Sequence, residues 1–230
     1  MYFDPLYFKL MIPAMILAGI ATLITKTTFA KYSEVAASSG MTGAQAAKRL
    51  LEGEGISDVK IEETGGFLSD HYDPTSKTLR LSPTVFQSNS LSAIGVACHE
   101  AGHAIQHAAH FGPLHLRSAL VPATQIGSTG SYIFFILGLI FHQPGLVLIG
   151  VGLFSLVVVF SLVTLPVEWD ASARAKRLMV SAGIVSPQEQ ISAGKVLNAA
   201  FMTYVASAIS ALLTLLYYLL RSGLLGGRRD

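Results

Sequence analysis

The sequence predicts a mainly α-helical, polytopic membrane protein with about four transmembrane helices and a small α+β extramembrane part. Three observations predict this fold class. Of the 230 residues, 51% are hydrophobic and only 13% are charged, whereas an ordinary soluble domain is about 25% charged. The apolar residues are gathered into four long runs instead of being spread along the chain. The polar segments between these runs carry helix caps, strand-like alternation and turn residues.

Four runs are long enough to cross a bilayer, whose hydrocarbon core of about 30 Å needs about 20 mostly apolar residues in a helix. We expect the first run to be a span and not a cleaved signal peptide, because it is too long and no basic cluster precedes it. His142–Gly145 is a turn signal, so the second and third spans should form a hairpin. The predicted spans are 6–25, 120–141, 146–167 and 201–220.

The order of the spans also predicts a topology. Four spans place both termini on one side of the membrane and segments 26–119 and 168–200 on the other. Seven lysines and arginines lie near the span ends on that second side and four on the terminal side, which favours a cytoplasmic location for the two internal segments. We therefore predict a multi-pass protein of the cell membrane, with the lipid bilayer as a partner. The net charge of +2 is too balanced for a nucleic-acid partner.

The internal segments should fold, and we treat residues 1–230 as one domain. Thr42 can cap a helix over 43–52, and Ser90 can cap another over 91–110. Strands are expected near 57–63, 67–72 and 78–82, with turn signals between them and Pro83 ending the last strand.

The second of these helices contains an H-E-x-x-H motif, formed by His99, Glu100 and His103. Positions i and i+4 lie one above the other on a helix face, so the two imidazoles can hold one Zn²⁺ ion. Glu100 points about 100° around the helix and can act as a base towards a water beside the ion without binding the ion itself. A helical context and apolar flanks support this interpretation.

A catalytic zinc usually has a third protein ligand. Glu168 and Asp170 follow the third span closely, and a helix starting after Pro166 would point them about 200° apart. We favour Glu168 as the ligand, because an acid next to an apolar span needs a partner, and Asp170 as a helix N-terminal charge. His107 and His110 share the face of His99 but lack metzincin spacing, so they are expected to shape or polarise the cleft or to be simply exposed.

Three separated runs resemble the YugP-like neutral zinc metallopeptidases of bacterial membranes. They are GGFLSDHYDPTSKTLRLS (65–82), SNSLSAIGVACHEAGHAIQH (88–107) and LPVEWDASARA (165–175). The resemblance implies a zincin-like, gluzincin-type endopeptidase with His99, His103 and Glu168 as zinc ligands and Glu100 as base. A looser similarity to HtpX-like proteases has a departure at Ser172, where that motif has aspartate. This departure leaves Asp170 or Asp73 as the expected partner of a ligating histidine.

The resemblance implies a peptide or protein substrate, and the closeness of Glu168 to a span suggests membrane proteins. We expect strand 78–82 to be an edge that can pair with substrate. The oxyanion donor stays open among Tyr72, Tyr204, His71 and Arg174. Two other functions remain: a zinc hydrolase acting on another amide, or a non-catalytic membrane scaffold with structural zinc. The single cysteine, Cys98, speaks against the scaffold, and its thiol is expected to be a small packed side chain.

Overall fold

The computed structural model describes residues 4–66 and 69–225. These residues form two compact units, which we describe separately. The apolar unit comprises Met1–Ala21, Leu116–Leu165 and Thr203–Asp230, and the mixed unit comprises Thr22–His115 and Pro166–Met202. Four long helices contribute residues to both units: α1 (Pro5–Ser33), α5 (Gly112–Ile140), α6 (Pro144–Ser181) and α7 (Pro187–Arg221).

Within the described residues, these four helices are the ones long and apolar enough to cross a membrane. Each overlaps one predicted span, and the second span extends one residue beyond α5, so the mainly α-helical, polytopic fold class is confirmed. Many large apolar side chains of the apolar unit are exposed; Met15 and Ile126, for example, expose 70% and 73% of their surface. Such a surface is unfavourable in water and suits lipid contact.

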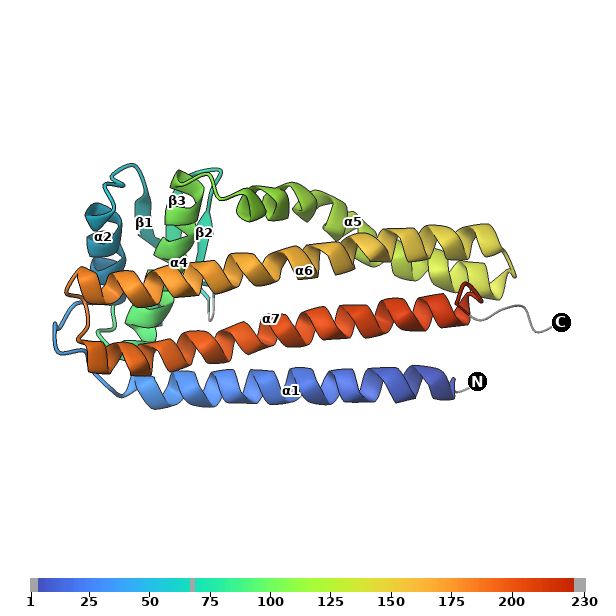
Figure 1. Ribbon diagram of the computed structural model, residues 1–230, viewed down its shortest axis with the longest axis horizontal. Helices are drawn as coiled ribbons and strands as arrows, with labels where there is room; N and C mark the ends of the chain where they lie inside the picture. Colours follow the sequence, from blue (N-terminus) through green and yellow to red (C-terminus); the bar gives the residue numbers. More distant parts are fainter. Residues whose placement is uncertain (1–3, 67–68, 226–230) are drawn as a thin grey trace. The chain divides into compact units, whose positions relative to one another are not determined.

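The apolar unit has a small aromatic core where α5, α6 and α7 meet. Phe135 stacks on Tyr218 with ring centroids 3.8 Å apart, and Val147 and Val151 complete the cluster. In the same unit, the hydroxyl of Tyr217 donates to the carboxylate of Asp4 over 3.1 Å. This hydrogen bond joins the end of α7 to the residue before α1, and Figure 1 shows α1 and α7 side by side.

The mixed unit packs a three-stranded sheet, three shorter helices and parts of the long helices around one apolar core. The strands are β1 (Lys60–Glu63), β2 (His71–Asp73) and β3 (Thr78–Leu81), in the order β1-β3-β2. β1 is parallel to β3, and β2 is antiparallel to it. The sheet contacts α4, and α2 packs along α4 (Figure 1). The helices of this part of the chain are α2 (Gly43–Gly53), α3 (Pro83–Phe86) and α4 (Leu91–Ala108).

Side-chain caps explain where the two helices begin. The Thr42 hydroxyl and Gln45 form a reciprocal capping box at the start of α2. The Ser90 hydroxyl accepts the amide hydrogen of Ala93 at the start of α4. Both predicted helices are confirmed to within two residues at each end.

The strands differ more from the sequence-based expectation. They are shorter than predicted, and residues 67–68 of the predicted second strand lie outside the described residues. The expectation that strand 78–82 is an edge is wrong: β3 is the central strand, and β1 and β2 are the edges. Leu79 and Leu81 are completely buried, so this strand gains most apolar burial in the centre of the sheet.

The expectation of a helix start after Pro166 is also wrong. Pro166 lies inside α6, which continues to Ser181. Proline is tolerated inside a long apolar helix when neighbouring groups satisfy the backbone carbonyl that it frees. As a result, one continuous helix carries both Glu168 and Asp170.

Candidate metal centre

The two histidines of the motif lie on one face of α4, as the four-residue spacing requires. Their ring centroids are 4.8 Å apart. The opposite side of this helix is built from small side chains such as Ala97 and Ala101, which are completely buried in the core. The apolar packing therefore fixes which way the face with the histidines points.

Glu168 reaches the same point from α6. Gly102 allows the close approach, because a Cβ atom there would lie only 2.7 Å from the carbonyl oxygen of Ala171. Glu168 Oε2 lies 3.1 Å from His99 Nε2 and 3.7 Å from His103 Nε2. Only 1% of the Glu168 surface is exposed, and a buried carboxylate is costly unless cationic or metal partners compensate for it.

The three side chains fit a zinc ion. Their ligand atoms all lie within 4.8 Å of one another. Two atoms each about 2.0–2.1 Å from a tetrahedral zinc are about 3.4 Å apart, and the two measured nitrogen–oxygen distances lie on either side of that value. Two imidazoles and one carboxylate are also a donor set typical of catalytic zinc, which keeps a fourth position open.

The outer nitrogen of each imidazole is held by a hydrogen bond. His99 Nδ1 lies 3.1 Å from the hydroxyl of Ser172, and His103 Nδ1 lies 2.9 Å from Oε1 of Gln106. With Nδ1 protonated and bonded outward, each Nε2 presents its lone pair to the ion. Gln106 is itself fixed, because its amide nitrogen donates to the carbonyl of Val167 at 2.8 Å.

Two opposing effects act on the pKa of His103. Burial disfavours the imidazolium, but the hydrogen bond to Glu168 and the negative charges of Glu168 and Glu100 outweigh burial and raise the pKa of His103. The acidic pocket therefore attracts a cation, and a proton competes with a metal ion for the same nitrogen.

Glu100 does not belong to the group of possible metal ligands formed by His99, His103 and Glu168. Its Oε2 accepts a hydrogen bond of 3.0 Å from the backbone amide of Tyr72 in β2. The Tyr72 hydroxyl lies 2.9 Å from His107 Nδ1. The link between β2 and Glu100 was missed by sequence reasoning, because it joins residues that are 28 positions apart through the pairing of β2 with β3.

A comparison with models of protein families identifies the family of this chain. Residues 7–223 match the model of a family described as "Putative neutral zinc metallopeptidase". The chain belongs to this family of neutral zinc metallopeptidases. It is therefore an enzyme with zinc as its cofactor, and the resemblance that the three sequence runs indicate is confirmed.

A curated relative of this neutral zinc metallopeptidase comes from Bacillus subtilis (strain 168), where it carries the name "Putative membrane protease YugP". The two sequences are 44% identical over 215 residues, which cover 94% of this chain and 96% of the relative. No solved structure matches the chain.

The expectation that Asp170 or Asp73 is the partner of a motif histidine is wrong for this neutral zinc metallopeptidase, because Ser172 and Gln106 are the partners. Asp170 Oδ2 instead accepts from Gln106 at 2.8 Å and from Arg174 at 2.6 Å. It is not a helix N-terminal charge either, because α6 begins 26 residues earlier, at Pro144. Asp73 pairs with Arg80 at 3.0 Å. The hydroxyl of Ser172 takes the place that the HtpX-like motif gives to aspartate.

Three of the candidate oxyanion donors, and Cys98, remain to be placed in the structure. His71 Nδ1 lies 2.7 Å from the carbonyl oxygen of Ser69, and Arg174 is paired with Asp170. Tyr204 belongs to the apolar unit. Cys98 is completely buried, and burial raises the pKa of its thiol to about 12, which confirms a packed and unreactive side chain.

Proposed function

We propose that the chain is a membrane-embedded endopeptidase in which His99, His103 and Glu168 bind the catalytic zinc and Glu100 is the general base. The observation that carries this proposal is the orientation of the four side chains. Both Nε2 atoms point towards Glu168, while Glu100 is turned aside and held by the amide of Tyr72. A purely structural zinc site needs no such separate carboxylate.

Zinc at this site supplies a Lewis acid that polarises the scissile carbonyl and makes a nearby water more acidic. Glu100 takes the proton of that water and later delivers it to the leaving amine. The Tyr72 amide holds Oε2 of Glu100, so the proton is carried by Oε1. Ser172 and Gln106 keep the imidazoles in the tautomer that the site needs.

The same proposal extends to the setting of the site. Glu168 follows the apolar run of α6 by one residue in the sequence, so substrate bonds near the membrane surface are expected to be cleaved, including those of membrane proteins. The basic residues near the span ends favour the cytoplasmic side. We treat the whole chain, residues 1–230, as one functional domain, because the ligands come from both internal segments.

Substituting Glu100→Gln tests the proposed role directly. We expect purified Glu100→Gln protein to keep its zinc and to lose peptide cleavage by about 10²–10⁴-fold, since the amide cannot accept the proton. The matched control is Glu62→Gln, which removes an exposed carboxylate on β1 and should change neither quantity. Cleavage by Glu100→Gln at the wild-type rate would refute the assignment of Glu100 as the base.

A further inference from the structure

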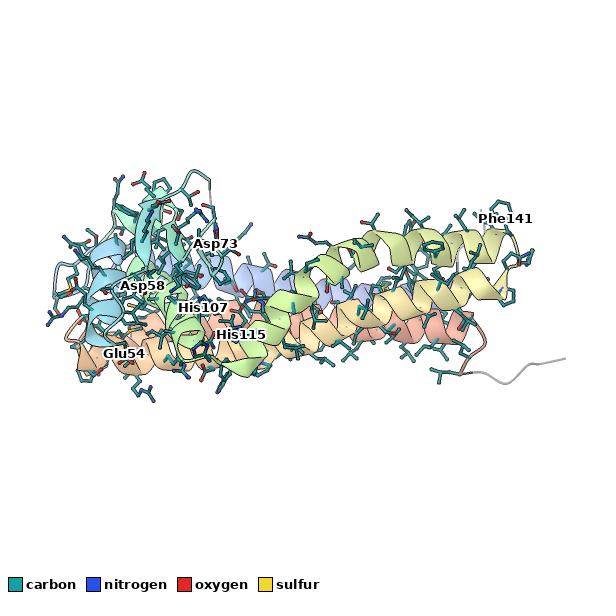
Figure 2. The ribbon with its side chains drawn as sticks, turned by 90° about the horizontal axis from the view of Figure 1, so that it is seen from above. Glu54, Asp58, Asp73, His107, His115 and Phe141 are labelled. Atoms are coloured by element: carbon teal, nitrogen blue, oxygen red, sulfur yellow. The ribbon has the colours of Figure 1, made fainter. Side chains whose placement is uncertain are left out.

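A cavity lies in the mixed unit, and one of its lining residues, Tyr72, is hydrogen-bonded to the proposed base. Its volume is about 290 Å³. It is lined by the C-terminal part of α4 and His110 after it, by the loop before β1, by β2, and by Lys77 in the turn between β2 and β3. Asp58 of the loop before β1 and His107 both line the cavity, and the ring of His115 lies beside His107, with centroids 5.8 Å apart (Figure 2). None of the proposed zinc ligands lines this cavity.

Tyr72 connects the cavity to Glu100. Its backbone amide donates to Glu100 Oε2 over 3.0 Å, while its side chain lines the cavity and its hydroxyl lies 2.9 Å from His107 Nδ1. His107 is one helical turn beyond His103, which is about 6 Å along α4. Since an extended peptide advances about 3.3 Å per residue, a side chain one or two residues from the scissile bond reaches this cavity.

The walls of the cavity determine which side chain it accepts. Ile56, Val59, Ala104 and Ala108 form apolar walls, and the two alanines leave the space open. The rings of Tyr72 and His107 line the same cavity, with centroids 5.9 Å apart. Apolar walls with aromatic rings bind a large flat side chain by burial and by edge or offset ring contacts.

Charge does not select the ligand of this cavity. The two full charges in its lining, Asp58 and Lys77, form an ion pair with each other. Burial, followed by unfavourable electrostatic interactions such as that with Lys77, lowers the pKa of His107, which favours its neutral ring. An acidic or basic side chain would lose water in this cavity without gaining an unpaired opposite charge.

We propose that this cavity is the specificity subsite of the enzyme and that it takes a bulky uncharged side chain, by preference aromatic, from a residue one or two positions from the scissile bond. This inference rests on the proposed endopeptidase function. It adds a substrate class to that function, namely peptides with an aromatic or other large apolar residue near the cleaved bond.

A matched pair of substitutions tests the inference. Ala108 is exposed and lines the cavity, whereas its neighbour Ala109 is exposed and does not. The full-length, zinc-loaded wild type and the variants Ala108→Phe and Ala109→Phe are given a peptide library that varies around one bond, and kcat/KM is determined for phenylalanine and alanine peptides. We expect the wild type to prefer phenylalanine about tenfold or more. Ala108→Phe should bring this ratio close to one, and Ala109→Phe should keep it.

A third variant, Val59→Ala, guards against loss of fold in Ala108→Phe, because it enlarges the same cavity and should raise the relative kcat/KM of tryptophan peptides. Zinc content and melting temperature verify that each variant is folded. Identical side-chain preferences in the wild type and both cavity variants, with cleavage intact, would overturn the subsite and leave the proposed function standing. Absence of any peptide cleavage by the zinc-loaded wild type would refute the proposed function and the subsite with it.

Discussion

At the scale of single residues, the proposed metal centre is supported by hydrogen bonds from groups that are not among its proposed ligands. Ser172 and Gln106 hold the outer nitrogens of the two histidines. Gln106 is in turn fixed by Val167 and Asp170 of α6. These hydrogen bonds replace the aspartate that related motifs use, so a neutral hydroxyl orients His99 in this enzyme.

We predict that Ser172→Ala weakens zinc binding by about 10–100-fold, which is the usual cost of removing such an outer partner. The loss follows because His99 no longer has a fixed ring orientation. Competition with a fluorescent chelator measures the affinity. Ser181→Ala, an exposed serine near the end of the same helix, is the control and should bind zinc like the wild type. Equal affinities in the two variants would show that the hydroxyl has no such role.

At the scale of elements, the site requires the close packing of α4 against α6. Gly102 has no side chain at the point where the two backbones meet. A methyl group there would lie 2.7 Å from a carbonyl oxygen, so one helix has to move. Because the proposed ligands His99 and His103 lie on α4 and the proposed ligand Glu168 lies on α6, this movement would separate them.

We therefore predict that Gly102→Ala lowers the melting temperature, by an amount that corresponds to about 1–3 kcal/mol of overpacking, and reduces the zinc content. Thermal unfolding and metal analysis of the purified full-length protein measure the two effects. Gly95→Ala, on the same helix, is the control, because its new Cβ would be at an ordinary 3.4 Å from the nearest atom. A Gly102→Ala protein as stable and as zinc-rich as Gly95→Ala would contradict this view of the contact.

The elements also show what the sequence can predict. The helix α4 and its metal-facing side follow from local rules, namely a serine cap and a four-residue spacing. The order of the strands does not, because the pairing of β1 with β3 joins segments that no local pattern connects. The passage of α6 through Pro166 was missed for a similar reason: the proline is a local stop signal, and surrounding structure overrides it.

At the scale of the whole molecule, the enzyme combines a small polar catalytic segment with four apolar helices. Large exposed apolar side chains on these helices favour a bilayer as their surroundings. The motif runs were enough to predict the family and to single out His99, His103 and Glu168, which the fold brings together. They could not predict the cavity beside Tyr72, since its lining comes from separate segments of the chain that only the fold brings together.

The proposed membrane setting predicts a preference for tethered substrates. A peptide sequence attached to a transmembrane segment should be cleaved faster than the same sequence in solution, because the membrane raises its local concentration near the site. Both forms are incubated with the enzyme in the same liposomes, and initial rates are compared. Equal rates for the two forms would contradict a membrane-surface substrate.

The central claim is that one zinc ion is held between His99, His103 and Glu168. An anomalous difference map recorded at the zinc absorption edge from crystals of the zinc-loaded protein tests it most directly. We predict one strong peak at about 2.0–2.2 Å from Nε2 of both histidines and from a carboxylate oxygen of Glu168. A map with no peak there, or with its strongest peak at His107 or His110, would contradict the proposed zinc site.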